Sequence, residues 1–333
     1  MSSVNGQSQG GCRVPLDPDA AAILTAMQQQ GLPPMETLEP DEVRARMEAA
    51  AALSAGPEAE VASVEQHVLG GVPSLVITPE GDGPFDVLVW FHGGGWVIGS
   101  AAQSLHTGKD LAASGGLMVV LPDYRLAPEH PFPAAYDDAM AVTRAVLAQA
   151  TELGGPGARV AVGGDSAGGN LAALAALFVP GLVHQTLAYP VTDATMEHPS
   201  YQRVESGYIL TASMMRWFVD LYVGDGDRTD PRVSPLHAAE ESLRQSCRAH
   251  VVVAGYDPLC DEGEAYARRL ADAGVPVTIA RYDGQMHGFL TMGAFLPTGV
   301  QAMHEAIDHL RRALGSSLAG EERRTVHTGP GDA

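Results

Sequence analysis

The sequence predicts an α/β protein in which helices cover both faces of a mostly parallel β-sheet. Short runs of β-branched residues alternate with longer Ala-rich stretches along most of the chain, and this alternation is typical of the crossover units that join parallel strands. Two of the runs, VLVWF at 87–91 and VVVA at 251–254, are almost continuously apolar, as expected for strands buried on both faces. The 333 residues suffice for one large domain with a smaller lid.

The individual elements follow from local patterns. Strands are expected where β-branched runs end at Gly or Pro, at residues 85–91, 117–122, 159–162, 185–189, 250–254 and 275–282. Helices are expected at residues 134–153, 167–179, 262–273 and 298–314. His67 falls in a further strand at the edge of the sheet, whereas His304 and His309 are expected on the exposed face of the last helix.

Two regions interrupt the alternation. The first 55 residues predict two helices, at 17–30 and 39–53. Residues 194–235 show no strand pattern and carry several Met and aromatic residues. A segment of that length is often a lid over the site of an α/β enzyme. The polar, Gly-rich residues 316–333 predict a flexible tail.

The composition excludes several classes of protein. With 40 acidic and 20 basic residues the net charge is −20, which argues against nucleic acid or an anionic membrane as a partner. The longest apolar run, at 171–179, is far shorter than the roughly 20 residues that cross a bilayer. Lys109 is the only lysine, which fits either the arginine codons of a GC-rich genome or adaptation to salt.

Cysteine usage and the N-terminal residues predict a reduced, cytoplasmic protein. Cys12, Cys247 and Cys260 form neither a close pair nor a metal pattern with a neighbouring histidine. Residues 1–12 have no cationic start and no apolar core of a signal peptide.

The strongest indication of chemistry is GDSAGG at 164–169, which lies between an expected strand and an expected helix. It has the G-x-S-x-G form of a nucleophile elbow, a turn so tight that only small residues fit two positions before and after the serine. The turn would expose the Ser166 hydroxyl where the helix start favours an oxyanion. The pattern also occurs by chance in Gly-rich chains, and a phosphate-binding loop is a further alternative, but no G-K-[ST] follows it.

A second glycine-rich segment, HGGGW at 92–96, follows the strand expected at 85–91. Consecutive glycines allow backbone N–H groups to converge on one point, as a tetrahedral oxyanion requires. Together with the N–H of Ala167 they would form a three-donor oxyanion hole. The alternative is a flexible glycine loop without a catalytic role.

A serine nucleophile needs a base, and the base needs a carboxylate that holds its tautomer. Of the twelve histidines, His287 follows the last expected strand in a loop at the same sheet edge. Asp257 lies just past the strand expected at 250–254, which Pro258 ends. Asp261 and Glu262 come at an expected helix start, where capping is the simpler interpretation. The chain order serine, aspartate, histidine is that of α/β-hydrolases and differs from the orders of trypsin-like and subtilisin-like proteases.

With these residues the chain resembles the hormone-sensitive lipase family of bacterial esterases, also called bacterial lipase family IV. The matching segments are HGGGW, DYRLAPEHPFP at 123–133, GDSAGG in its GDSAG form, YPVTD at 189–193, DPLCDEG at 257–263 and HGF at 287–289. The resemblance implies an α/β-hydrolase fold with a mostly parallel eight-stranded sheet, flanking helices and a helical cap. Residues 1–55 and 194–235 match the cap, which leaves 56–193 and 236–315 as the two parts of the catalytic core.

The resemblance also implies roles for individual residues. Ser166 is the expected nucleophile, His287 the general base and Asp257 its orienting acid. The expected oxyanion donors are the N–H groups of Gly94, Gly95 and Ala167. The residues expected to support them are His92, Gly93 and Asp165. The 123–133 segment is expected to buttress the oxyanion loop.

The implied substrates are small carboxylic esters with short to medium acyl chains, cleaved without cofactor or metal. Dimerisation is common among the proteins that the chain resembles. Trp96, Met214, Trp217 and Phe218 either line an acyl pocket or dock the cap on the core. Hydrolysis of amides or carbamates by the same triad remains an alternative. A non-catalytic receptor like the plant gibberellin receptor is a second one, although that receptor lacks the catalytic histidine and His287 is present here.

Overall fold

The computed structural model describes residues 14–54 and 58–315. Cys12, the predicted tail at 316–333, and the first residues and the end of the predicted 1–55 cap segment lie outside the described residues. Cys247 and Cys260 are free thiols. No helix of the described part is long and apolar enough to cross a membrane.

The sheet contains eight strands in the order β1-β2-β4-β3-β5-β6-β7-β8. Their bounds are β1 Ser63–Leu69, β2 Val72–Thr78, β3 Val87–Phe91, β4 Met118–Pro122, β5 Val160–Asp165, β6 His184–Ala188, β7 Arg248–Tyr256 and β8 Val277–Met286. β2 pairs antiparallel with β1 and β4, and the neighbours from β4 to β8 pair in parallel. The predicted eight-stranded, mostly parallel sheet is confirmed.

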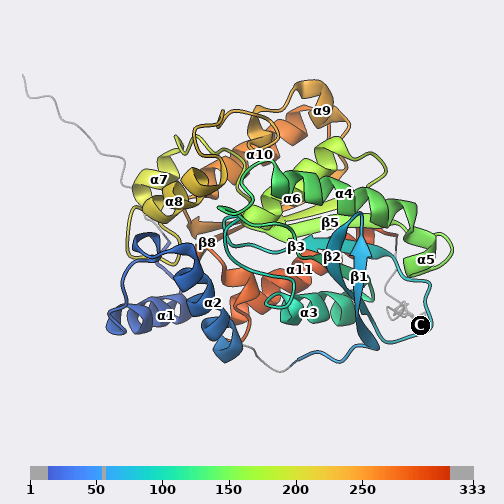
Figure 1. Cartoon of the computed structure of the whole chain (residues 1–333), viewed down its shortest axis with the longest axis horizontal. Helices are drawn as coiled ribbons and strands as arrows, with labels where there is room; N and C mark the ends of the chain where they lie inside the picture. The colour runs from blue at the N-terminus through green and yellow to red at the C-terminus, as the bar shows by residue number, and fades with distance from the viewer. Residues whose placement is uncertain (1–13, 55–57, 316–333) are drawn as a thin grey trace, which may run out of the picture.

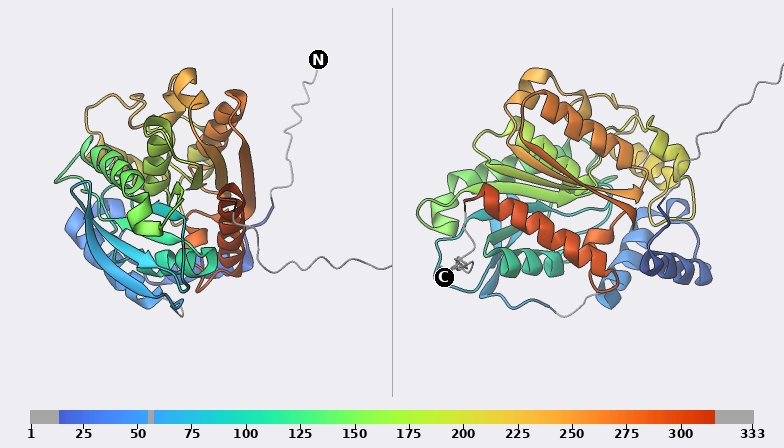
Figure 2. Two further views of the ribbon diagram at one scale, coloured as in Figure 1. Left: turned by 90° about the vertical axis from the view of Figure 1, so that its right-hand side faces the viewer. Right: turned by 180° about the vertical axis from the view of Figure 1, so that it is seen from behind.

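Helices cover both faces of this sheet (Figures 1 and 2). α3 and α11 pack on one face, and α4, α6 and α10 pack on the other. The α-helices are α1 Pro18–Gln29, α2 Pro40–Ser54, α3 Leu105–Gly115, α4 Ala134–Ala148, α5 Ala150–Gly154, α6 Ala167–Phe178, α7 Pro199–Arg203, α8 Ala212–Tyr222, α9 Glu240–Arg244, α10 Cys260–Asp272 and α11 Pro297–Ala313. Three short 3-10 turns are η1 Met35–Thr37, η2 Pro235–His237 and η3 Phe289–Thr291.

Several predicted bounds differ from the structure, and the three largest differences are these. The helix expected at 134–153 is two helices, α4 and α5, divided at Gln149. β5 continues past its predicted end through two glycines to Asp165. β8 continues past residue 282 to Met286, because alternating exposed and buried residues extend the strand where the apolar run stops. The longer β5 and β8 end directly before Ser166 and His287.

The strand order has a topological switch point at the carboxyl ends of β3 and β5. The chain runs from β3 to β4 on one side of it and then crosses to β5 on the other side. Loops that leave neighbouring parallel strands in opposite directions open a crevice at that point, where α/β proteins bind ligands. HGGGW follows β3 and Ser166 follows β5, so the topology brings the two glycine-rich segments together.

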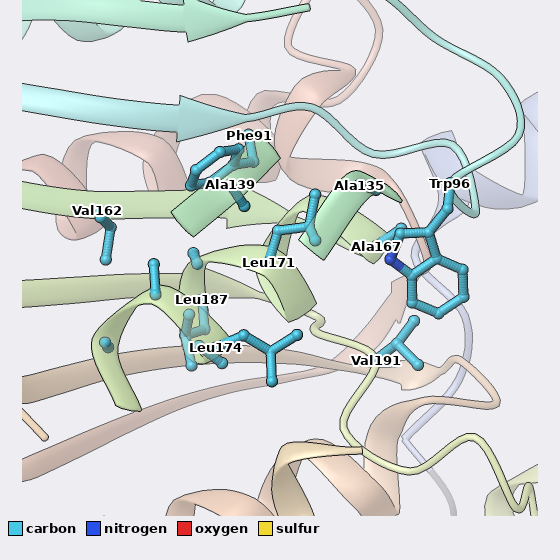
Figure 3. Close-up of a cluster of buried hydrophobic side chains, with 14 of the residues drawn as sticks. Phe91, Trp96, Ala135, Ala139, Val162, Ala167, Leu171, Leu174, Leu187 and Val191 are labelled. Atoms are coloured by element: carbon cyan, nitrogen blue, oxygen red, sulfur yellow. The ribbon is translucent and has the colours of Figure 1, made fainter. Parts of the chain in front are cut away.

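The helix after Ser166 is enclosed by the core. Every residue of α6 from Ala167 to Leu177 is buried. Figure 3 shows Leu171 and Leu174 of this helix among side chains that include Val162 and Leu187 of the sheet. A helix packed on all sides has little freedom to shift, so its first turn is held firmly beneath Ser166.

The two segments predicted as a cap lie side by side beyond the carboxyl end of the sheet, α1 and α2 beside α7 and α8 (Figures 1 and 2). The Ser213 hydroxyl of α8 donates to Glu36 of η1 at 2.6 Å. The backbone N–H of Asp17 donates to the carbonyl of Gly284 at 2.8 Å. The first of these contacts joins the two predicted cap segments, and the second joins the N-terminal segment to β8. The boundaries of the cap stay a prediction.

Candidate active site

Ser166 stands at a turn that the surrounding backbone holds in a strained conformation. Its φ of 58° and ψ of −120° lie where few residues other than glycine are found. Its N–H donates to the carbonyl of Ala188 at 2.9 Å, and its carbonyl accepts from Asn170 and Val191 at 3.0 and 3.2 Å. Such bonds sustain the strain, which is typical of functional sites.

The turn admits only small residues, as the sequence pattern predicted. A Cβ on Gly164 would lie 2.4 Å from the carbonyl carbon of Gly168. A Cβ on Gly168 would lie 2.0 Å from the carbonyl oxygen of Phe91. Both contacts are with backbone atoms, which have no room to yield.

The structure brings Ser166, His287 and Asp257 into one hydrogen-bonded series. Nε2 of His287 lies 3.0 Å from Oγ of Ser166, and Nδ1 of His287 lies 2.7 Å from Oδ2 of Asp257. The other oxygen of Asp257 accepts from the N–H of Leu259 at 2.8 Å. A carboxylate at Nδ1 keeps the proton on that nitrogen, so the lone pair of Nε2 faces the serine.

The three side chains differ in exposure in a way that suits their expected roles. Asp257 is 0% exposed, whereas Ser166 and His287 retain 7% and 9%. They follow β5, β7 and β8, so one sheet edge positions all three. The charge of Asp257 is therefore shielded from water while the hydroxyl and the imidazole remain reachable.

The loop after β3 presents backbone donors beside this series. Gly94 and Gly95 have φ of 115° and 59°, and the carbonyl of Gly94 accepts from the N–H groups of Val97 and Ile98 at 3.0 and 2.9 Å. A Cβ on Gly94 would lie 2.1 Å from the Ile98 carbonyl oxygen. Across residues 14–54 and 58–315, the N–H groups of Gly94, Gly95 and Ala167 donate to no other group. They remain available to a ligand.

His92 and Tyr124 support this loop from behind. Their rings stack with centroids 4.3 Å apart, and the Tyr124 hydroxyl donates to the His92 carbonyl at 2.8 Å. Nδ1 of His92 lies 2.7 Å from the Gly93 carbonyl. Burial lowers the pKa of His92, so the ring is neutral and serves packing. The predicted buttress at 123–133 thus contacts the loop through Tyr124.

Asp165 also contacts the loop. A Cβ on Gly93 would lie 2.3 Å from Oδ2 of Asp165, so the carboxylate lies against the Gly93 backbone. Part of Asp165 remains accessible to solvent. Burial of its carboxyl nevertheless raises its pKa to about 6. The charge of His287 and the hydrogen bond from the Gly93 N–H act on this pKa in the opposite direction. Asp165 therefore changes its protonation close to neutral pH, next to the loop.

The prediction that Asp261 and Glu262 cap a helix is wrong. The side chain of Glu262 is fully buried and accepts from the N–H of Thr192 at 2.7 Å and from the Tyr201 hydroxyl at 2.8 Å. Asp261 binds the Arg203 guanidinium at 2.5 Å. Both side chains point to segments distant in sequence, so α10 begins at Cys260 without a side-chain cap. The prediction that His309 is exposed is also wrong, because its ring is half-buried on His250.

Of the four residues proposed to line an acyl pocket or dock the cap, Trp96 belongs to the loop itself and Phe218 packs against it. A Cβ on Gly95 would lie 2.2 Å from the Phe218 ring. Trp96 is fully buried and stacks on Tyr222 of α8 at 4.6 Å, so substrate could reach it only if this stack opened. Met214 is buried, and the half-buried Trp217 packs on Phe218.

Sequence patterns missed Asn170, which joins the elbow helix to the 194–235 segment. Its side-chain amide donates to the carbonyls of Val191 and Val233 at 2.9 and 2.7 Å. The only signal in the sequence is an amide in the middle of an otherwise apolar helix.

Comparison with known proteins identifies the family of the chain. A family described as "alpha/beta hydrolase fold" matches residues 88–291. "Ethyl acetate hydrolase" of Pseudomonas putida is 37% identical over 90% of this chain and 99% of its own. "Carboxylic ester hydrolase LipN" of Mycobacterium tuberculosis is 38% identical over 81% of this chain and 76% of its own.

A solved structure shows the same architecture. It is an ester hydrolase from the metagenome of Lake Arreo, complexed with a derivative of bipyridine phosphonate. It superposes with a TM-score of 0.86 at 37% identity, over 90% of this chain and all of its own. The eight-stranded sheet, the matched family and these similarities agree, and the chain therefore belongs to the α/β-hydrolase superfamily, within the hormone-sensitive lipase family of esterases.

Proposed function

We propose that the protein is a serine carboxylesterase that hydrolyses short- to medium-chain acyl esters through an acyl-enzyme on Ser166. The main support for this proposal is the hydrogen-bonded series from Ser166 through His287 to Asp257. The N–H groups of Gly94, Gly95 and Ala167, which have no hydrogen-bond partner among the described residues, support a role as oxyanion donors. The esterase names of the relatives support the same reaction.

In the acylation step, Oγ of Ser166 attacks the ester carbonyl carbon while Nε2 of His287 takes its proton. The carbonyl oxygen becomes an oxyanion that receives hydrogen bonds from the N–H groups of Gly94, Gly95 and Ala167. Collapse of this intermediate breaks the bond to the alkoxide, which leaves with the proton from His287. The carboxylate of Asp257 stabilises the imidazolium throughout.

Deacylation repeats these steps with water. His287 takes a proton from the water as its oxygen attacks the acyl carbon, and the same three N–H groups hold the second oxyanion. The bond to Oγ breaks, Ser166 recovers its proton from His287, and the carboxylic acid leaves. Atoms balance as one ester and one water giving one acid and one alcohol.

Aromatic side chains near the loop support the restriction on acyl length. Phe218 lies against Gly95, and Trp96, the next residue of the loop, stacks on Tyr222 of α8. Bulky rings this close to the oxyanion donors leave less room for an extended acyl chain than for a short one.

A series of p-nitrophenyl esters from acetate to palmitate tests the proposal. We expect kcat/KM to be highest for short and medium chains, and kcat of Ser166→Ala to be lower by about 10⁴ or more. Ser104→Ala is the matched control, because this hydroxyl makes no cap contact with α3. Near-wild-type turnover in Ser166→Ala would overturn the proposed nucleophile. Preference for the matching p-nitroanilide would favour the amide hydrolase instead.

Phe218→Ala tests the restriction on acyl length. Removal of the ring opens space next to Gly95, so we expect the ratio of kcat/KM for octanoate over acetate to rise by about tenfold. Arg216→Ala, an exposed neighbour on the same helix, serves as the control with an unchanged ratio. An unchanged ratio in Phe218→Ala as well would show that this ring does not limit acyl length.

A further inference from the structure

Three metal-ligating side chains meet on the face of the sheet that α11 covers. His250 lies in the middle of β7, and Glu305 and His309 lie one helical turn apart on α11. One ligand atom from each of these residues lies within 4.8 Å of the other two. In the described part of the chain this is the one such group, and it includes none of the catalytic side chains.

His250 carries two buried nitrogens without partners. The residue is 0% exposed, and neither ring nitrogen has a hydrogen-bond partner among residues 14–54 and 58–315. Buried polar atoms are nearly always paired, and an exception calls for a bound water or ion. A neutral imidazole has one nitrogen with a lone pair, and no described residue occupies either nitrogen of this ring. Neutral imidazole is the form that binds metal ions.

We propose that His250, Glu305 and His309 bind a divalent transition-metal ion such as Zn²⁺. Two imidazole nitrogens and one carboxylate oxygen are a donor set that zinc accepts, with water in the fourth position. The Tyr282 hydroxyl donates to Oε2 of Glu305 at 2.6 Å, which orients the carboxylate as outer partners do in metal sites.

Binding requires one ring to turn. The rings of His250 and His309 stack with centroids 4.2 Å apart and planes 13° apart. Because the lone pairs of imidazole lie in the ring plane, parallel rings cannot both point at one ion. His309 is half-buried and can rotate about its Cβ–Cγ bond, whereas the enclosed His250 stays fixed.

The ion would tie α11 to β7 and act on stability, not on the ester bond. The three ligands are far apart in sequence and form no local motif. They include none of the triad residues, so the metal-free hydrolysis that the family resemblance implies is unaffected. The proposal therefore stands or fails independently of the esterase activity.

Metal binding to the full-length protein tests the site. The chain is stripped with EDTA and titrated with ZnCl₂ by calorimetry, and Co²⁺ replaces Zn²⁺ for visible absorption spectra. We expect one ion per chain and a tetrahedral Co²⁺ spectrum. Tm should rise by about 4 °C when free Zn²⁺ is about a hundred times its Kd.

Variants locate the ion. His309→Ala and Glu305→Gln, whose side chains are only half-buried, should weaken binding at least about tenfold while the apo proteins remain folded by circular dichroism. His304→Ala changes an exposed histidine of the same helix and should bind as tightly as wild type. Absence of stoichiometric binding would overturn the site. So would unchanged binding in His309→Ala, or an equal loss in His304→Ala, which would indicate adventitious binding to surface histidines.

Discussion

Replacing Asp257 by Asn tests whether the hydrogen bond at Nδ1 sets the tautomer of His287. Oδ2 of Asp257 lies 2.7 Å from that nitrogen, and Oδ1 accepts from the N–H of Leu259 at 2.8 Å. In Asp257→Asn the Leu259 amide retains the oxygen as its acceptor, so the new NH₂ group faces His287. Nδ1 must then accept, the proton moves to Nε2, and Nε2 donates to Ser166 instead of taking its proton.

The expected loss follows from this change. A base in the wrong tautomer costs about 10⁴ in kcat, which corresponds to about 5.5 kcal/mol of transition-state stabilisation. KM should change little, because Asp257 is 0% exposed and cannot contact the substrate. The size of the side chain is conserved, so the fold should persist.

Steady-state hydrolysis of p-nitrophenyl butyrate, with circular dichroism as a check of folding, measures the loss. Asp261→Asn is the matched control, since Asp261 forms a partly exposed ion pair with Arg203 and its loss should alter kcat by less than about twofold. If folded Asp257→Asn kept more than a tenth of wild-type kcat, the assigned role of Asp257 would be refuted.

Three further substitutions probe the supports of the site. Gly93→Ala places a Cβ 2.3 Å from Oδ2 of Asp165, so the displaced loop should lower kcat for the butyrate ester by about 10²–10³. The pKa of Asp165 is raised to about 6, so its stabilising contribution is complete below about pH 4 and is lost as the pH rises through 6. Between pH 4 and pH 7 the unfolding free energy, measured by urea titration, should fall by up to about 3 kcal/mol less in Asp165→Asn than in the wild type. Glu262→Ala leaves the Thr192 N–H and the Tyr201 hydroxyl without their acceptor, and urea unfolding should show a loss of about 3 kcal/mol or more.

For each of these substitutions, the result opposite to the expected one would contradict the role assigned to the residue. Wild-type kcat in Gly93→Ala would mean that the loop tolerates a side chain there. An unchanged pH profile in Asp165→Asn would mean that its carboxyl is well solvated. Wild-type stability in Glu262→Ala, as expected for the exposed Glu241→Ala control, would mean that the buried carboxyl contributes little.

Much of the site could be predicted because its chemistry is tied to local patterns. Ser166, Asp257 and His287 each follow a strand that ends at the carboxyl edge of the sheet, and parallel strands bring such ends together. A Cβ on Gly164 or Gly168, two positions before and after Ser166, would lie 2.4 or 2.0 Å from a backbone atom, a constraint that only glycine satisfies. Geometry and sequence therefore agree on which residues meet, while their catalytic roles stay proposals.

The features that the sequence did not reveal depend on contacts between distant segments. Glu262 stands in the first turn of a helix, where a local pattern favours capping, but its partners come from the loop after β6. His309 falls on the polar side of α11 by periodicity, yet its ring covers His250 of β7. The position of Phe218 over Gly95 likewise requires the fold of the whole 194–235 segment.

Covalent labelling tests most directly whether Ser166 is the nucleophile of the esterase reaction. An excess of a p-nitrophenyl phosphonate is added to the protein, and the labelled peptide is identified by mass spectrometry. We expect one phosphonyl group per chain, attached to Ser166, with loss of esterase activity in proportion to labelling and no label in Ser166→Ala. Labelling at another residue, or full activity after Ser166 is modified, would contradict this expectation.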